Sequence, residues 1–229
     1  METATTFDID GGIARIVLDD GKANALSAER LGEIGRRLDA AERAGAVVVL
    51  SGREGIFSAG FDLRTFKRGI DATVEMLQAG ADLILRILAF PQPILTVCTG
   101  HAYPMGAFLM MAADVRFAAA GPWKIGMNEV AIGLTLPRFA VELARHRLSA
   151  PGFARVQAGA MYDPEEALRL GFIDRIIAAD QLADAVAAEA TRLRALDMPS
   201  FTATKARINE TAIAAIRKAI AEDLHTTSR

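Results

Sequence analysis

The sequence has few of the features that mark the specialised classes of protein. Only one of its 229 residues is cysteine, so the chain cannot form an internal disulfide. That residue, Cys98, lies in an apolar stretch and is interpreted as an inert core residue rather than a nucleophile. Neither sign of charge dominates, because the formal net charge is −2. We therefore expect no general attraction to nucleic acid or to an anionic membrane surface.

Several sequence motifs are also absent. Every long apolar run is interrupted by a charge, proline or histidine, so no membrane span is expected. The opening METATTFDIDGG carries acidic residues and no apolar core of a signal peptide, which predicts a cytoplasmic protein. The sequence contains no H-x-x-x-H or C-x-x-C pattern, so no metal site is expected. No G-x-G-x-x-G or G-x-x-x-x-G-K-[ST] motif indicates a dinucleotide or nucleoside triphosphate site.

What is present is enough apolar material for a large core, since 52% of the residues are hydrophobic and 24% are charged. Strand-like runs alternate with helical patterns, which predicts an α/β fold. We expect one domain, with a core over residues 1–195 and a C-terminal helical segment over 196–229.

The element pattern is clearest in the first half of the chain. We expect two short strands within 5–19, a helix after Ser27 and a buried strand at 46–50, followed by a glycine-containing loop at 51–63. Further expected elements are a helix at 71–89, strands at 93–98, 115–118, 123–126 and 172–178, a short helix after Asp163 closed by Gly171, and helices at 180–196 and 200–222.

The stretch TGHAYPMGAFLMMAADV, residues 99–115, organises this pattern. It turns at Gly100 directly after a buried strand and continues into a helix that is apolar nearly all round. Such a turn leaves backbone N–H groups free at the start of the helix. The loop 51–63 also follows an apolar strand, and two converging N–H groups form an oxyanion hole. From spacing alone, two purely structural turns remain an alternative.

Four segments together resemble the crotonase superfamily, which comprises enoyl-CoA hydratases, enoyl-CoA isomerases and their relatives. The segments are FSAGFDL (57–63), TGHAYPMGA (99–107), GMNEVAIGLTLP (126–137) and DPEEALRLGFIDRII (163–177). They occur in the family's order and cover nearly the whole chain. The resemblance implies a crotonase (ClpP-like) ββα superhelix with a C-terminal helical trimerisation region, assembled as a homotrimer or a dimer of trimers.

The resemblance also implies the catalytic residues. The backbone N–H groups of Phe61 and Met105 match the oxyanion hole, although the family usually has glycine where Met105 stands. Glu129 matches the family's catalytic glutamate, and its apolar surroundings predict a raised pKa suited to a general base. A helix-end or salt-bridging role for Glu129 is the alternative from the residues alone.

Phe108 is an informative departure from the family pattern. Two-glutamate hydratases that resemble this chain carry their second glutamate there. A single carboxylate favours moving a double bond over adding water. We therefore predict an acyl-CoA enzyme of fatty-acid metabolism, a Δ3,Δ2-enoyl-CoA isomerase that acts on an acyl-CoA thioester without a separate cofactor. A single-glutamate enoyl-CoA hydratase and a non-catalytic acyl-CoA-binding protein remain alternatives.

The expected substrate and CoA contacts follow from the same resemblance. They are Lys22, Ala23, Ala25, Ala59, Gly60, Asp62, Leu63, Gly106, Phe108 and Leu134, with Phe61, Phe66 and Met76 as further candidates for the acyl pocket. The cations Arg64, Lys67 and Arg68 could meet the CoA phosphates or form an ordinary solvated face. His101, beside the second turn, is expected to be a hydrogen-bonded structural residue.

Overall fold

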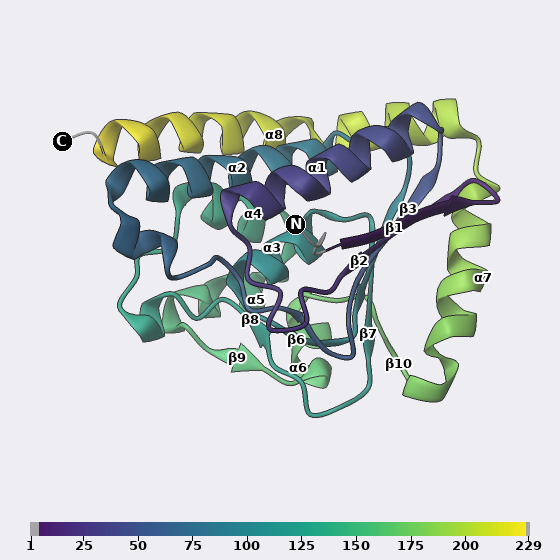
Figure 1. The fold of residues 1–229 in the computed structure, drawn as a ribbon, viewed down its shortest axis with the longest axis horizontal. Coiled ribbons are helices and arrows are strands. Elements are labelled where there is room, and N and C mark those ends of the chain that lie inside the picture. The colour runs from purple at the N-terminus through teal and green to yellow at the C-terminus, as the bar shows by residue number, and fades with distance from the viewer. Residues whose placement is uncertain (1–4, 228–229) are drawn as a thin grey trace.

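The fold is given by a computed structural model that describes residues 5–227. Within these residues the strands form a large sheet of six strands, ordered β1-β2-β3-β5-β7-β10, and a small sheet of four, ordered β4-β6-β8-β9 (Figure 1). The large sheet contains β1 Thr5–Asp10, β2 Ile13–Leu18, β3 Val47–Gly52, β5 Ile94–Cys98, β7 Val115–Ala119 and β10 Arg175–Ile177. The small sheet contains β4 Gly55–Ser58, β6 Gly100–Ala102, β8 Ile125–Gly126 and β9 Met161–Tyr162.

The helices fill the intervals between these strands. In chain order they are α1 Ala28–Arg43, α2 Ile70–Leu88, α3 Pro104–Ala112, α4 Arg138–Arg147, α5 Ala150–Arg155, α6 Pro164–Leu170, α7 Leu182–Arg194 and α8 Met198–Thr227. Short 3₁₀ turns are η1 Thr65–Arg68, η2 Val130–Ile132, η3 Val156–Ala158 and η4 Ala179–Gln181. The expected α/β class is therefore confirmed.

The predicted caps explain where two helices begin. The Ser27 side chain accepts a hydrogen bond from the N–H of Arg30 at the start of α1. The Asp163 side chain does the same for Glu166 at the start of α6, and Gly171 ends that helix in the left-handed region. A side-chain acceptor at the N-cap satisfies a donor that has no partner inside the helix. Both predicted helix starts are confirmed.

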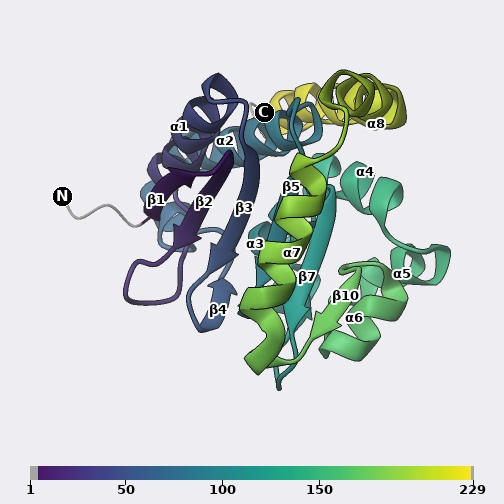
Figure 2. The same ribbon diagram turned by 90° about the vertical axis from the view of Figure 1, so that its right-hand side faces the viewer.

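The central strands β3, β5 and β7 of the large sheet are buried on both faces. Strands β2, β3, β5, β7 and β10 are parallel, and β1 joins β2 through an antiparallel hairpin. Alternate residues such as Val47, Val49 and Leu95 pack against α7, whereas Val48 and Leu50 point into the main core. Figure 2 shows α7 lying across one face of the sheet, with α1, α2 and α8 at one end of the molecule. This two-sided burial accounts for the continuous apolar runs in the sequence.

The small sheet corrects two expectations. The segment 51–63, expected as a loop, contains β4, and β6 follows directly after β5 within the expected turn at 99–106. These two strands pair in parallel with each other. Strands of three or four residues show no period in the sequence, so only their tertiary pairing defines them.

The C-terminal helix α8 packs against α2 and α4 and is anchored by buried polar groups. The Lys205 ammonium lies 2.7 Å from the Asp114 carboxylate, which also accepts a 2.8 Å hydrogen bond from the N–H of Ile94. The Asn209 amide donates to the carbonyl of Leu88 at 2.8 Å. The expected boundary between residues 195 and 196 falls in the turn between α7 and α8. No helix in the part of the chain described here is long and apolar enough to cross a membrane.

The ion pair of Lys205 with Asp114 gives a stability prediction. Lys205 is 5% exposed, and burial lowers its pKa while Asp114 opposes that change. Replacing Asp114 with Asn leaves the ammonium without a counter-charge, and the expected loss is about 3–5 kcal/mol of unfolding free energy. Urea denaturation measures this loss.

The matched control is Glu142→Gln. Glu142 pairs with Arg145 on the surface of α4, where an ion pair contributes about 0–1 kcal/mol. Equal losses in the two variants would show that the Lys205 pair does not hold α8 in place.

Candidate active site

The first turn of the site lies between β4 and η1 and presents the N–H of Phe61. Residues Leu26 and Phe61 form an isolated parallel bridge in which the Leu26 N–H donates to Gly60 O (2.8 Å) and the Asp62 N–H donates to Leu26 O (3.1 Å). The bridge therefore involves the carbonyl of Gly60 and the N–H of Asp62, and it does not involve the N–H of Phe61. Among the hydrogen bonds of residues 5–227, none uses this N–H.

The second turn is the start of α3. Tyr103 is the N-cap residue, but its side chain makes no capping hydrogen bond, and Pro104 occupies the first helical position. The next N–H, that of Met105, has no acceptor among the described residues. An N–H in the first turn of a helix carries part of the positive end of the helix dipole. This group can therefore bind an oxygen that develops negative charge.

The two turns approach each other closely at Gly60. A Cβ on Gly60 would lie 3.4 Å from the nitrogen of Pro104 and 3.5 Å from the nitrogen of Met105. Gly60 also has φ +85°, which disfavours any other residue. A side chain there would be in van der Waals contact with the start of α3, so glycine leaves the space beside the Met105 N–H open.

The methionine at position 105 does not obstruct the turn. Met105 is fully buried, and its sulfur lies 3.2 Å from the position that a Cβ on Gly80 of α2 would take. The Cζ atom of the Phe61 ring lies 2.7 Å from the same Cβ position on Gly80. Both side chains therefore pack on α2, in the space that the missing side chain of Gly80 provides. The departure from the family's glycine leaves the N–H donor in place.

Glu129 supplies the carboxylate. It directly precedes η2, its carbonyl accepts hydrogen bonds from the N–H groups of Ile132 and Leu134, and it is 7% exposed. Its Oε2 atom is buried and has no hydrogen-bond partner among the described residues. Burial raises the pKa of Glu129 from an ordinary 4.5 to about 7. The alternative of a surface salt bridge is thus not supported for Glu129.

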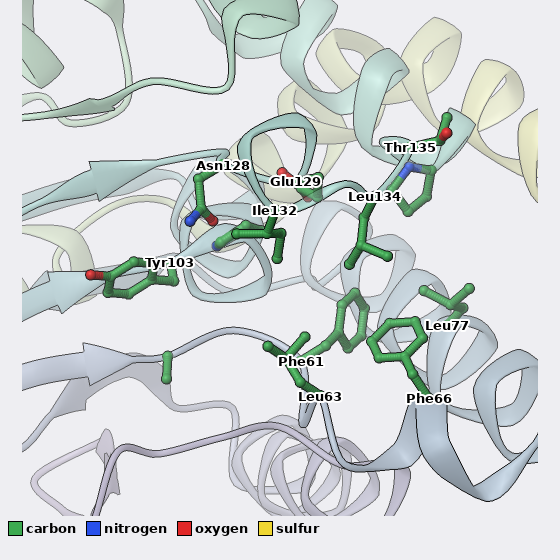
Figure 3. A pocket seen from close by; sticks show the side chains of 13 residues that line it. Phe61, Leu63, Phe66, Leu77, Tyr103, Asn128, Glu129, Ile132, Leu134 and Thr135 are labelled. Carbon is green, nitrogen blue, oxygen red and sulfur yellow. The ribbon is translucent and has the colours of Figure 1, made fainter.

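Phe61 and Glu129 line a cavity of about 300 Å³ (Figure 3), whereas Gly60 and Met105 are next to lining residues in the sequence but are not themselves in the wall. Its wall is formed by Ala59, Phe61, Leu63, Phe66, Leu77, Tyr103, Pro104, Asn128, Glu129, Ile132, Leu134, Thr135 and Pro137. Phe61, Phe66 and Leu77 gather on one side, and Tyr103 and Asn128 lie together on the other. Of the described residues in this wall, Glu129 alone is acidic. The cavity can therefore take an apolar chain, with one carboxylate available for proton transfer.

The structure places six of the predicted site residues in the wall, namely Ala59, Phe61, Leu63, Phe66, Glu129 and Leu134. Sequence reasoning missed Tyr103, Asn128 and Thr135. All three lie inside the motifs that resemble the crotonase superfamily, Tyr103 in 99–107 and Asn128 and Thr135 in 126–137, so membership of these motifs was the available signal. Leu77 lines the cavity, whereas the expected Met76 is fully buried in the core. Successive helical residues point in different directions, and composition cannot tell which one faces a cavity.

Phe108 does not line the cavity. Its side chain is fully buried, and its ring packs edge-on against Phe139 with the centroids 6.0 Å apart. Gly106 is also buried, and a Cβ there would lie 2.9 Å from the Cβ of Ser58, so it serves the packing of α3 on β4. Neither Gly106 nor Phe108 lines the cavity, so the structure does not place Phe108 in the wall of the expected acyl pocket.

Of the residues expected to bind CoA, Ala59 and Leu63 line the cavity, whereas Lys22, Ala23, Ala25 and Asp62 lie outside its wall, in the loop before α1 and just before η1. Lys22 and Ala23 are exposed, and Ala25 and Asp62 are half-buried. Asp62 holds Arg64 through two hydrogen bonds of 2.8 and 2.9 Å, and this pairing lowers the pKa of Asp62. Lys67 and Arg68 are exposed on η1, a 3₁₀ turn rather than the expected helical face.

His101 has a structural environment. Its Nδ1 atom accepts a 3.0 Å hydrogen bond from the N–H of Lys124, and its ring stands edge-on to Trp123. It is not part of the cavity wall. Among the described residues no group of three or more potential metal ligands occurs.

Fold and site together define an α/β protein with an apolar cavity, one buried carboxylate in its wall, and two nearby main-chain N–H groups that have no acceptor among the described residues. A family model for enoyl-CoA hydratase/isomerase matches residues 8–228. The chain belongs to this family, within the crotonase superfamily.

Individual relatives agree with this assignment. A probable enoyl-CoA hydratase, echA17 of Mycobacterium avium, is 36% identical over 213 residues, covering 87% of this chain and 79% of the relative. A crystal structure of an enoyl-CoA hydratase/isomerase family protein from Pseudomonas syringae superimposes with a TM-score of 0.94 at 36% identity, covering 96% of each chain. An apo enoyl-CoA isomerase from Mycobacterium tuberculosis gives a TM-score of 0.91 at 34% identity, covering 96% of this chain and 97% of the other.

The raised pKa of Glu129 predicts how stability depends on pH. Between pH 4.5 and 7 the folded protein keeps a proton that the unfolded chain releases, so unfolding becomes easier as pH rises through this window. Relative to Glu129→Gln, which cannot ionise, the wild type is expected to lose about 3 kcal/mol across the window. Urea denaturation of both proteins at a series of pH values measures the difference. A stability difference that stays constant with pH would show that Glu129 titrates as an ordinary carboxylate.

Proposed function

We propose that the protein is a Δ3,Δ2-enoyl-CoA isomerase. The observation that carries the proposal is the composition of the cavity wall. Among its described residues Glu129 is the one acid, and the N–H groups of Phe61 and Met105 lie in the two turns next to the cavity. A thioester carbonyl would accept hydrogen bonds from the N–H groups of Phe61 and Met105. Apolar surroundings make such preorganised dipoles more effective than in water.

One carboxylate suffices for the reaction. The Glu129 carboxylate removes a proton from C2 of a 3-enoyl-CoA, and the electron pair delocalises over C2, C3, C4 and the carbonyl oxygen. The two N–H groups stabilise the negative oxygen, and Glu129 returns the proton to C4. A double bond then lies between C2 and C3. No redox agent or separate cofactor takes part, because the proton lost at C2 is regained at C4.

Hydration makes a different demand on the site. Addition of water to a 2-enoyl-CoA needs a water molecule that is both held and deprotonated, and a second carboxylate is suited to that task. Phe108, where two-glutamate hydratases carry a glutamate, is a buried phenyl group against Phe139. A single-glutamate hydratase is the second candidate, favoured by Asn128 and Tyr103, which are polar wall groups able to hold water. A non-catalytic binding protein is less well supported, because the donors and the carboxylate are both in place.

Assembly and location rest on the family resemblance. We propose a homotrimer or a dimer of trimers in the cytoplasm. Val130 and Ile132, which follow Glu129, are about half exposed, and burial of such apolar side chains would favour association.

The two catalytic candidates separate by substrate. Purified protein is given 3-enoyl-CoA and, separately, 2-enoyl-CoA, and the products are resolved by chromatography. We expect conversion of the 3-enoyl to the 2-enoyl ester to exceed formation of 3-hydroxyacyl-CoA. Faster hydration would assign the hydratase, and binding of CoA esters without turnover of either would assign the non-catalytic protein.

Glu129→Gln tests the base. It is expected to lower kcat by about 10²–10⁴, the usual contribution of a positioned general base, and to leave the Kd of a saturated CoA ester within several-fold. In the wild type, kcat/KM should fall about tenfold per pH unit below pH 7, since only the ionised carboxylate accepts the proton. Glu142→Gln on α4 is the control with unchanged kinetics. Near-full turnover of Glu129→Gln would mean that another group is the base.

A further inference from the structure

Ser58, at the end of β4, is a fully buried polar residue that belongs to neither the cavity wall nor the catalytic groups. It precedes Gly60 by two residues and lies beside the N-terminus of α3. Its hydroxyl forms hydrogen bonds with Asn24 and Gly60, and its carbonyl accepts a hydrogen bond from Tyr103. These contacts link Ser58 to the two turns that present the unpaired N–H groups.

The hydroxyl of Ser58 holds the first turn. It donates to the carbonyl of Asn24 at 2.8 Å and accepts from the N–H of Gly60 at 3.0 Å. The next peptide group is held from the other side, because Gly60 O accepts from the Leu26 N–H at 2.8 Å. In a trans peptide the N–H points opposite to the C=O, so the N–H of Phe61 is turned away from Leu26. Both peptide groups that flank the flexible Gly60 are thereby fixed.

The loop that accepts the Ser58 hydroxyl bond is itself rigid. Asn24 is 2% exposed and has φ +51°, and its side-chain amide donates to Leu18 O at 2.8 Å and Phe57 O at 3.1 Å. Its side-chain oxygen accepts from the N–H of Asp20 at 3.0 Å. The Ser58 hydroxyl is therefore oriented by a fixed acceptor, and its lone pair is directed at Gly60.

The main chain of Ser58 holds the second turn. Its carbonyl accepts a 2.9 Å hydrogen bond from the N–H of Tyr103, the N-cap residue of α3. Its Cβ packs at the position where Gly106 has no side chain. The N–H of Met105 lies between these two contacts in the sequence, so its placement depends on the distance between Ser58 and α3.

We propose that Ser58 is a positioning residue that sets the separation and direction of the Phe61 and Met105 N–H groups. The proposal rests on the proposed function, since the two groups matter only if they bind a thioester oxygen. Loss of the hydroxyl leaves the Gly60 N–H without its acceptor and frees the Ala59–Gly60 peptide, while the Gly60 carbonyl stays bonded to the Leu26 N–H. With only one of its two flanking peptides held, Gly60 defines the direction of the Phe61 N–H less closely during the reaction.

The test uses Ser58→Ala and a readout that does not depend on turnover. Butyryl-CoA labelled with a heavy isotope at its carbonyl carbon is bound to the protein, and the carbonyl stretching frequency is measured by difference infrared spectroscopy. Two hydrogen bonds to the oxygen lower this frequency relative to the ester in solution. We expect Ser58→Ala to return the frequency towards the solution value and to leave butyryl-CoA affinity within about threefold. We also expect it to lower kcat with 3-enoyl-CoA by about 10–100-fold, less than the roughly 10²–10³-fold loss of kcat that follows removal of a whole donor.

Thr96→Val is the matched control. Thr96 is a fully buried hydroxyl residue of β5 outside the cavity wall, and valine has nearly its shape. It should preserve the carbonyl shift and kcat even where stability falls. Should Ser58→Ala not fold, Ser58→Cys, whose sulfur is a weaker acceptor, is expected to show a partial loss of the shift.

The outcomes separate the two claims. If a folded Ser58 variant keeps the wild-type carbonyl shift and kcat, the positioning role is overturned and Ser58 has only a structural role. The proposed oxyanion hole then still stands. An unshifted carbonyl in the wild type overturns the proposed oxyanion hole, and the role of Ser58 with it. Equal losses in Ser58→Ala and Thr96→Val also overturn the role, because any buried hydroxyl would then do the same.

Discussion

The close approach of two turns, one at Gly60 and one at the start of α3, is the constraint on which the rest of the site depends. A Cβ on Gly60 would lie 3.5 Å from the nitrogen of Met105, so main chain meets main chain with no side chain between. Buried N–H groups normally find partners within the protein, and two that do not are a costly arrangement unless a ligand supplies the acceptor. The parallel pairing of β4 with β6 brings both turns to the same edge of the small sheet.

Burial acts on the carboxylate and the donors in opposite but complementary ways. Removing water from around Glu129 destabilises its charge and raises its pKa to about 7, which suits proton transfer near neutral pH. The same removal strengthens the interaction of a main-chain dipole with a developing oxyanion. In the proposed mechanism, the apolar wall made by Phe61, Leu134 and their neighbours therefore contributes without reacting.

Much of the fold could be predicted from local pattern. The helix after Ser27, the buried strand β3 and the capped helix α6 each have a period, a cap or a continuous apolar run that is readable in the sequence. The strands β4 and β6 could not be predicted, because each is too short to show a period and is defined by its partner. In the site, Glu129 was readable as an isolated acid among apolar residues, whereas Leu77 was not distinguishable from Met76.

The sequence by itself determined the family, the residue that can act as the base and the glycines that allow the turns to form, since each depends on the identity of a residue at a position. Only the tertiary structure decided which groups are left without partners. Among residues 5–227, the N–H groups of Phe61 and Met105 have no acceptor because of the bridge to Leu26 and the start of α3, and Phe108 lies outside the cavity wall because its ring packs on Phe139. Hydrogen-bond satisfaction and burial are properties of the assembled chain, and no single segment contains them.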